Sequence, residues 1–464
     1  MNFIQQGIQN IMNWAYGNQP LRDEYDDAAG ARMKALASLI SYYDGKQRKP
    51  LHVTALGKDY NVITNHVRTI VDRSVSMLMG GGVTFDLPGE GESEQDIIIN
   101  TVWDANRKDI LLHDLAQFGS IYGTPAIKII PDGKVGINGK VTHRLVALNP
   151  FNLTIYSASN DIENITAYVY RWSSGETALR ELTEKQDNGA WLVRTQKLDK
   201  STGGAWKLTD EQMWDYEFPP ITHGKNLPNA GNIYGYSDVE GIIDLQDKYN
   251  EAQSNVNKIL SLQAWAQKYI IGGKFPRIKD GKGGEYLDVG PDKALEIASE
   301  NAKVGILQPS GDLESSRQFA NDLRRDIFDI AGCVDSETVK DKVGALTNFG
   351  LRVLFKNELA KNTTKQLLYG DLLLNVNNRL LQLSGFSGEK ADPGKVQFGE
   401  ALPVDDVEQI TTLEKEKALG IRSNESLAKE RGINWVVEQE RLASEKAASN
   451  TLGGDMIRNF LAGR

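Results

Sequence analysis

The residue types that usually carry catalytic or metal chemistry are sparse in this chain and lack the spacing that such chemistry requires. None of the five histidines follows another at the HxxxH or HExxH spacing of a zinc site: they are His52, His66, His113, His143 and His223. The glycine run 80–82 is not followed by the Lys-Ser/Thr of a phosphate loop, and no GxSxG hydrolase motif occurs. The sequence therefore predicts no catalytic residue, no metal ion and no cofactor.

Three other features that suggest chemistry have simpler explanations. The single cysteine, Cys333, excludes a disulfide framework within one chain, so we expect a small packing residue and a reducing compartment. Glycines 80–82 end an apolar helical stretch and predict a helix stop. A third feature is an acidic cluster without the alternation of a calcium loop, which predicts a solvated segment: Asp23, Glu24, Asp26 and Asp27.

Length and composition favour a folded soluble protein of several domains. A chain of 464 residues, 40% hydrophobic and 25% charged, exceeds one core, and we expect roughly two to four domains. A net charge of −9 and a pI near 5.3 argue against gripping nucleic acid with a basic face. The N-terminus lacks a signal-peptide pattern and no apolar run reaches ~18 residues, so we expect a cytoplasmic or virion protein without membrane segments.

One long helical pattern dominates the elements that must position any functional residue. Apolar or small residues recur at helical spacing over residues 238–271, which predicts a helix of roughly 50 Å. A Gly-rich insert and a returning helix over 312–334 follow. An antiparallel pair of this length with a small module at its tip predicts a strut, and hence a mechanical role in an assembly.

The rest of the chain predicts a helical layer on an antiparallel sheet, an α+β arrangement. We expect helices over 31–43, 62–79, 96–119 and 345–383, and a charged helical tail after 404 with Ser423 as an N-cap. Short strands are expected over 126–130, 135–137, 141–148, 153–156, 165–172, 191–198 and 206–208. A further strand is expected over 396–402, and strands over 286–289 and 303–307 flank a short helix expected over 293–300. Asp132-Gly133 and Asn138-Gly139 predict hairpin turns.

An ordered set of short motifs resembles one known family. The motifs are Tyr42-Tyr43-Asp44-Gly45, Asn65 with Ile70-Val71-Asp72, Trp103-x-x-Asn106 with Gly119 and Tyr122-Gly123, and Gly235-Tyr236-Ser237-Asp238-Val239-Glu240-Gly241 leading through Leu245-Gln246-Asp247 and Asn250 to Ser254. In this order they resemble the portal proteins of tailed bacteriophages, the head-to-tail connectors, in the long-tailed branch. The resemblance covers about residues 20 to 450; Gly80-Gly81-Gly82-Val83 departs from the Gly-x-Pro-Val often found there.

The resemblance implies a division of the multi-domain α+β chain. It implies a wing of helices plus antiparallel sheet (1–237), stem helix 1 (238–273), a small α/β clip (274–309), stem helix 2 (310–335), a tunnel loop (336–344), a kinked helix with the wing return (345–404) and a helical crown (405–464).

The resemblance also implies the partners. Family members form a ring of about twelve subunits at one capsid vertex of the virion, after assembly in the host cytoplasm. Double-stranded DNA passes non-specifically through the channel, the large terminase docks outside, and capsid or scaffolding protein and a head-completion adaptor bind the ring. No hydrolysis and no membrane are implied.

Candidate residues follow from these regions. The DNA-facing tunnel loop would comprise Ser336, Lys340, Lys342 and Val343. Channel-facing stem candidates are Arg324, Arg325 and Asp329. The clip residues that would meet the motor are Lys274, Lys279, Lys282 and Tyr286. Mixed or acidic charge on a channel wall keeps phosphate binding weak enough for sliding. The alternative interpretation of each set is an ordinary solvated helix face or surface loop.

Two other functions remain open from the sequence. One is a nucleic-acid-processing enzyme with an unrecognised site in the α+β region, which predicts a low-order oligomer. The other is a non-channel minor head or adaptor protein, which predicts assembly only onto an existing ring.

Overall fold

The computed structural model describes residues 24–53, 57–87, 93–135, 141–175, 177–199, 206–264, 267–272, 277–279, 285–287, 301–307, 313–335, 337, 348–386, 391–402, 406–430, 435 and 438–444. The chain divides into two compact units, Met1–Ala401 and Leu402–Arg464. The fold is mixed α and β with more than one domain, which confirms the predicted class at this level.

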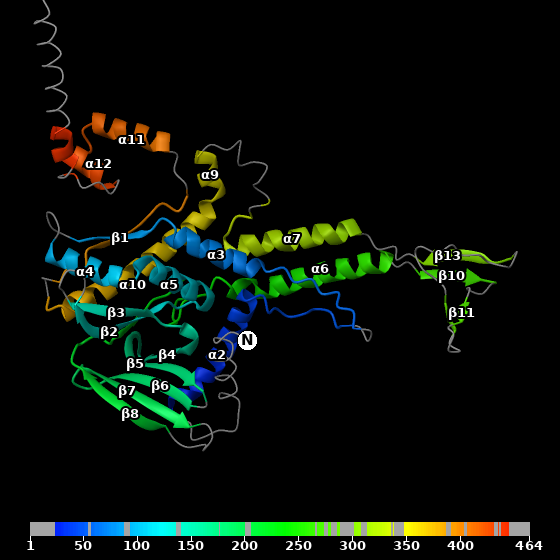
Figure 1. Cartoon of the computed structure of the whole chain (residues 1–464), viewed down its shortest axis with the longest axis horizontal. Helices are drawn as coiled ribbons and strands as arrows, with labels where there is room; N and C mark the ends of the chain where they lie inside the picture. Colours follow the sequence, from blue (N-terminus) through cyan, green and yellow to red (C-terminus); the bar gives the residue numbers. More distant parts are fainter. Residues whose placement is uncertain are drawn as a thin grey trace, which may run out of the picture. The chain divides into compact units, whose positions relative to one another are not determined.

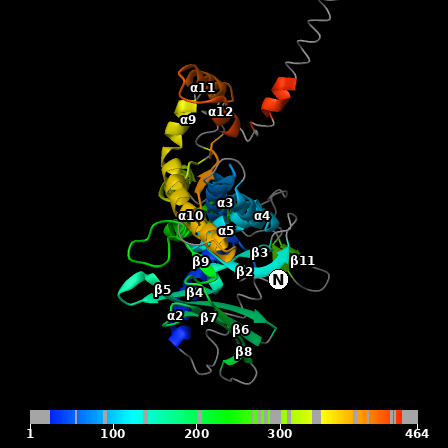
Figure 2. The same ribbon diagram turned by 90° about the vertical axis from the view of Figure 1, so that its left-hand side faces the viewer.

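The first unit is built in layers. Figures 1 and 2 show helices α3 (His66–Met79), α4 (Glu94–Ala105) and α5 (Lys108–Tyr122) on one side of a three-stranded sheet, with a five-stranded sheet on its other side. Helix α2 (Glu24–Tyr43) and the long α10 (Lys356–Leu383) pack against the same helices. The main core unites these helices with the three-stranded sheet, and includes Val67, Ile70, Trp103, Leu115, Ile127, Ile129, Tyr369 and Leu373.

Helix α3 shows how local sequence sets an element. Its buried residues recur at helical spacing, and the Asn65 side chain caps it by accepting a hydrogen bond from the Arg68 amide at 3.1 Å. The helix therefore begins at His66, four residues later than predicted. It ends at Met79, where the glycine run was expected to stop it, and Gly82 adopts a φ of +79° that few other residues tolerate.

The single helix predicted over 96–119 is wrong, because the structure has two helices, α4 and α5, with a corner between them. Arg107 at this corner lies in the left-handed region with φ 52°. The Asn106 side chain holds the corner, donating to Val102 O and His143 O at 2.8 Å each and accepting from the Leu145 amide at 2.8 Å. A side chain that replaces backbone partners in this way ends a helix despite continuous apolar spacing.

The two larger sheets are antiparallel. The three-stranded sheet has the order β3-β2-β9 and the five-stranded sheet the order β4-β5-β6-β7-β8. Their strands are β2 (Ala126–Val135), β3 (Val141–Ala147), β4 (Leu153–Ala158), β5 (Asp161–Ser174), β6 (Thr177–Lys185), β7 (Trp191–Asp199), β8 (Lys207–Trp214) and β9 (Ile221–His223). A 3-10 turn, η1 (Pro150–Asn152), precedes β4. Trp191 and Trp214 are buried in the second core, which joins residues of the five-stranded sheet to Ala126 and Ile221 of the three-stranded sheet.

One prediction about these strands fails, one is untested, and one strand was not predicted. Asp132-Gly133 does not form a hairpin: β2 continues to Val135, and a register shift between Pro131 and Lys134 absorbs the dipeptide as a bulge. Asn138-Gly139 lies outside the described residues. Strand β6 was not predicted, because its charged residues mask the alternation; it buries Arg180, which donates to Gln196 Oε1 at 2.7 Å.

The long helix is shorter than predicted. A 3-10 turn, η2 (Glu240–Ile242), leads into α6 (Ile243–Ala264), whose 22 residues span about 33 Å. Residues Gln267–Ile271 form strand β10 instead, paired antiparallel with β13 (Lys303–Leu307), because Tyr269, Ile270 and Ile271 favour a strand and find a partner there.

The predicted return helix is confirmed as α7 (Leu313–Ala331), which runs beside α6 in the opposite direction (Figure 1). Between the two helices, β11 (Arg277–Lys279) pairs with β12 (Glu285–Leu287). The strands expected at 286–289 and 303–307 are thus present as β12 and β13, whereas the helix expected over 293–300 lies outside the described residues. In the described part of the chain no helix is both long and apolar enough to cross a membrane.

After α7 the chain returns to the layered part of the first unit. Helix α9 (Asn348–Leu354) and α10 meet at a break at Phe355. Strand β14 (Lys395–Phe398) pairs antiparallel with β1 (Val83–Asp86). The second unit contains α11 (Asp406–Ala418) and α12 (Asn424–Glu430), and Ser423 accepts a hydrogen bond from the Ser426 amide at 3.2 Å, which confirms its capping role.

Replacing Asn106 by alanine should destabilise the fold, because three backbone groups at the corner lose their partner. We expect the free energy of unfolding to fall by about 1–3 kcal/mol, measured by chemical denaturation followed by circular dichroism. The control Asp104→Ala removes an exposed side chain from the same helix and should change it by less than about 0.5 kcal/mol. Equal stability of the two variants would contradict this role for Asn106.

Candidate functional site: a buried polar junction at the base of the long helix pair

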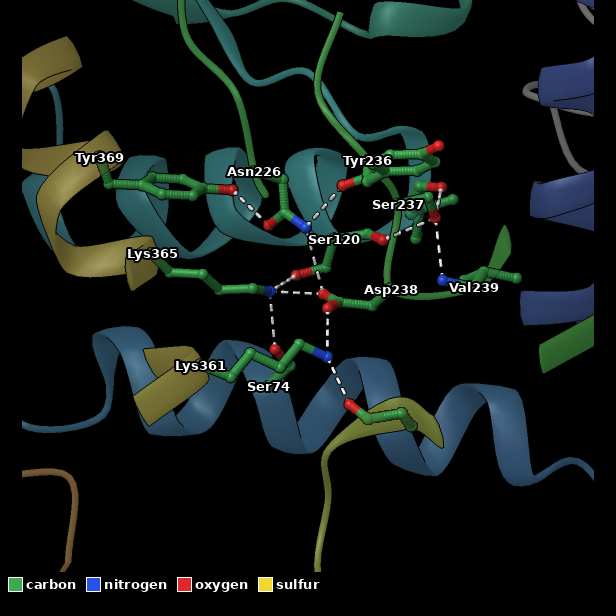
Figure 3. A network of polar contacts seen from close by, with 12 residues as sticks. Ser74, Ser120, Asn226, Tyr236, Ser237, Asp238, Val239, Lys361, Lys365 and Tyr369 are labelled. Atoms are coloured by element: carbon green, nitrogen blue, oxygen red, sulfur yellow. Dashed lines mark hydrogen bonds and ion pairs between the residues drawn. The ribbon is translucent and has the colours of Figure 1, made fainter. Parts of the chain in front are cut away.

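One face of α10 carries polar side chains that reach the base of the α6–α7 pair. Glu358, Lys361, Lys365 and Tyr369 follow one another at intervals of three or four residues, so they share one side of the helix. Each contacts a different part of the chain, and together these contacts form what we call the junction (Figure 3).

The centre of the junction is an ion pair between Asp238 and Lys365. Both side chains are almost completely buried. The Lys365 ammonium contacts the Asp238 carboxylate and also donates to Ser74 Oγ of α3 at 2.7 Å and Ser120 Oγ of α5 at 3.2 Å. Four segments far apart in sequence therefore meet at one ammonium group.

Lys361 connects both helices of the pair to α10. Its Nζ lies 2.7 Å from Asp238 Oδ1, just before α6, and donates to Ala331 O, the last residue of α7, at 2.6 Å. A lysine at a helix C-terminus satisfies a carbonyl that has no partner within the helix and complements the helix dipole. A single side chain thus joins the start of one long helix to the end of the other.

Glu358 holds the segment after α7 in a similar way. Its carboxylate accepts a hydrogen bond from the Val334 amide at 2.9 Å and forms an ion pair with Arg73 of α3 at 2.9 Å. The Arg73 guanidinium also donates to Val334 O. The backbone of Val334 is therefore fixed from both sides.

The motif Gly235–Gly241 supplies further hydrogen bonds around the junction. Ser237 Oγ donates to Ile121 O at 2.6 Å and accepts from the Val239 amide at 2.9 Å. Asn226 accepts from Tyr369 Oη at 3.2 Å and donates to Tyr236 O at 3.2 Å. A Cβ on Gly235 would lie 2.4 Å from Gly123 O, so only glycine permits this approach.

Charge on the junction follows from burial and proximity. Burial by itself raises the pKa of Asp238, but the ammonium groups of Lys365 and Lys361 outweigh it and hold this pKa below its ordinary value of 3.8. For Lys365, burial lowers the pKa more than the Asp238 carboxylate raises it. The shift at Asp238 thus favours the charged form of the pair, whereas the shift at Lys365 favours the neutral form. We take the pair as charged at neutral pH, because three oxygen acceptors around Nζ match the three donors of an ammonium group.

A second polar array runs along α6. We call residues 44–65, between α2 and α3, the strap. Gln246 donates to Thr64 O at 2.7 Å, Asn250 accepts from the Thr64 amide at 3.1 Å and Ser254 accepts from the Val62 amide at 3.0 Å. These three α6 side chains are fully buried, so the strap is fixed to α6 by directional hydrogen bonds.

None of this chemistry is catalytic in character. His66 and His223 are largely enclosed, and burial, followed by nearby arginines, lowers the pKa of each to about 4. Burial raises the pKa of the Cys333 thiol to about 11, in keeping with the predicted packing role. The described residues include no group of three or more His, Cys, Asp or Glu side chains placed to hold a metal ion.

Comparison with protein families identifies the chain. The family model described as "Phage portal protein, SPP1 Gp6-like" matches residues 23–451. The chain belongs to this family. Membership confirms the predicted resemblance and gives the protein a portal role in the phage virion; the family is structural and not enzymatic.

Two further comparisons were made with this portal protein. A chain in a solved structure described as "Virion of native gene transfer agent (GTA) particle" shares 14% sequence identity with it, with 92% of this chain and 98% of that chain covered and a TM-score of 0.44. Comparison with curated proteins gives no significant match.

The structure places only some of the predicted site residues of the portal protein. Arg324 forms ion pairs with Asp335 and Glu337 at 2.8 Å each, so its guanidinium holds the segment after α7. Arg325 pairs with Asp322 at 2.9 Å on an exposed face, and Asp329 is exposed. Their channel-facing role stays a prediction.

The loop and clip candidates are less completely placed. Ser336, Lys340, Lys342 and Val343 lie outside the described residues, as do Lys274 and Lys282. Lys279 lies in β11 and Tyr286 in β12, and these two strands pair with each other. The roles given to all eight stay predictions.

Sequence reasoning missed the junction itself. Glu358 and Lys365 lie in phase with the buried Tyr369, Leu372 and Val376 of α10. A charged residue in phase with an apolar face is the signal that was available, since such residues are buried only when they are paired.

Replacing Lys365 by methionine should strongly destabilise the portal subunit, because it leaves Asp238 buried with one cation fewer. We expect the free energy of unfolding to fall by about 3–5 kcal/mol, measured by chemical denaturation. Lys356→Met removes an exposed lysine from the same helix and serves as the control. A Lys365 variant no less stable than that control would show that the ion pair does not anchor the junction.

Mild acid should also weaken the fold through the buried histidines. The pKa of His223 is lowered in the folded state to about 4 from its ordinary 6.5, so the unfolded state binds the proton first. Stability is therefore full above about pH 6.5 and falls as the pH drops towards 4.

The measurement is the denaturation midpoint as a function of pH for wild type and His223→Gln. The glutamine keeps a polar partner for Tyr168, whose hydroxyl lies 3.0 Å from His223 Nδ1. The variant should show a shallower fall over this range; identical slopes would refute the assignment.

Proposed function

We propose that this portal protein forms a closed ring of about twelve subunits, around a channel that passes double-stranded DNA during packaging and ejection. The observation that carries the proposal is the family match over residues 23–451. In the proposal the ring occupies one capsid vertex of the virion and assembles in the host cytoplasm.

The junction supports a load-bearing role for the helix pair. Force applied along α6 or α7 reaches Asp238 and Ala331 at their bases, and Lys361 passes it from both to α10. Lys365 connects the same point to α3 and α5. A strut fixed to α10, α3 and α5 by buried, directional contacts suits a channel wall that must keep its shape while DNA moves.

The exposed charges of α7 suit sliding. Asp322 and Asp329 are exposed, and Arg325 on the same side of the helix pairs with Asp322. An acidic wall binds phosphates weakly, and about twelve copies at −9 each give a ring of about −100 charges. Arg324, Arg325 and Asp329 are proposed to line the channel, as mixed rather than uniformly basic charge.

The remaining regions are assigned by the same proposal. Lysines Lys340 and Lys342, with Ser336 and Val343, touch passing phosphates as the tunnel loop. The clip, with Lys274, Lys279, Lys282 and Tyr286, meets the large terminase and later the head-completion adaptor. The wing (1–237) and crown (405–464) face capsid or scaffolding protein and the genome.

The two alternative functions have less support. A structural family gives no basis for a nucleic-acid-processing enzyme, and nothing shows catalytic activity. A minor head or adaptor protein does not account for a portal match that covers most of the chain.

The mass of the untagged protein in solution tests the proposal, measured by light scattering and followed by negative-stain imaging of the same peak. We expect a particle of about twelve chains with a central hole. Co-expression with capsid and scaffolding protein provides the second condition. Monomers or dimers without rings in both conditions would overturn the channel proposal.

A further inference from the structure

The α7 helix carries two large apolar side chains that the rest of the subunit leaves uncovered. Phe319 is 56% exposed and Ile330 is 60% exposed, on a helix whose other exposed residues are mostly polar. They are eleven residues apart, which is about three helical turns, so both lie on the same side. Two aligned apolar residues of this size mark a contact surface.

A hollow lies beside each of these side chains, in the seam between α6 and α7. One, of about 310 Å³, is lined by Phe319 and Ser316 of α7 and by Lys248, Ala252 and Asn255 of α6, with Glu251. The other, of about 250 Å³, lies at the base of the pair, where Ile330 of α7 and Gly241 and Ile242 near the start of α6 meet Asp238 and Lys361 of the junction. Side chains of a second molecule therefore have room next to Phe319 and Ile330.

Next to this seam, the outer side of α7 is acidic. Asp322, Asp326 and Asp329 recur at intervals of four and three residues, whereas Leu323 and Ile327 between them are buried. The acidic side chains therefore point away from the core that the buried pair contacts. Asp326 lies between Phe319 and Ile330 on one side of α7, and we call these three residues the outer edge of α7.

The strap forms the opposite edge of the same layer and is basic. Its exposed charges are Lys46, Arg48, Lys49 and Lys58 against Asp44 and Asp59. Four positive and two negative side chains give the strap a formal charge of +2, and Lys46 pairs with Asp44 and Lys49 with Asp59. These pairs are solvent-exposed and therefore weak.

The α6 helix separates the two edges. Gln246 and Asn250 hold the strap, whereas Lys248 and Ala252 line the seam; residues two apart on a helix point about 200° away from each other. Figure 1 shows α6 between the strap and α7. Each subunit thus presents a layer with the order strap, α6, α7, basic at one edge and acidic at the other.

We propose that the outer edge of α7 docks onto the strap of the next copy of this chain. The contact covers Phe319 and Ile330 and sets Asp326, which lies on the same side of α7 between them, against Arg48 of the strap. It joins two different surfaces, a head-to-tail geometry that closes into a ring by repetition. The inference rests on the proposed ring and names the surface that closes it.

Charge reversal in the full-length protein tests the contact. The outer-edge variant carries Asp326→Lys, the strap variant carries Arg48→Glu, and a combined variant carries both. Phe319→Ser tests the apolar part. The control reverses two exposed aspartates of the five-stranded sheet region, Asp187→Lys with Asp210→Lys. Light scattering gives the fraction of chains in rings, and circular dichroism verifies that each variant is folded.

We expect each reversed variant, and Phe319→Ser, to lower the fraction in rings at least about tenfold, with the control unchanged and the combined variant restored. Restoration excludes misfolding as the cause, since the combined variant carries every change. If the wild type forms rings and the reversed variants do so equally well, this contact is overturned and the channel proposal stands. The same conclusion follows if the combined variant is folded but does not regain the wild-type fraction in rings. Absence of wild-type rings overturns both.

Discussion

The buried carboxylate of Asp238 is the constraint on which the rest of the first unit depends. An ion in a protein interior loses its water, and only close opposite charges with full hydrogen bonding offset that loss. Lys365 and Lys361 supply the charges, but they do so only if α10, α3, α5 and the base of α6 lie together as observed. Any other arrangement leaves a charge buried without its partners. The ion pair therefore favours one geometry among many apolar packings of similar energy.

The same preference for directional contacts appears along α6. Gln246, Asn250 and Ser254 occupy fully buried positions where leucine would be usual, and each bonds to the backbone of the strap. Apolar side chains would allow the strap to slide along the helix at little cost. Hydrogen bonds to particular backbone groups fix its register, because a shift of one residue leaves buried donors and acceptors without partners.

Elements with strong periodicity were predictable from the sequence, and contacts between distant residues were not. The pattern of α7 and the cap at Ser423 are local, and both were found. The end of α6 was missed because residues 267–271 fit either a helix or a strand until the pairing with β13 decides. The corner at Asn106 depends on β3, and the Asp238–Lys365 pair spans 127 residues of sequence. The motif around Asp238 was visible, but its partners were not.

The change from helix to strand beyond Ala264 has a consequence for stiffness. A helix resists torsion because every turn is bonded to the next, whereas a two-stranded antiparallel ribbon twists over a wide range of angles at small cost. The α6–α7 pair ends in such a ribbon, the five residue pairs of β10 and β13. The β10–β13 ribbon can therefore twist more easily than the helix pair that it extends.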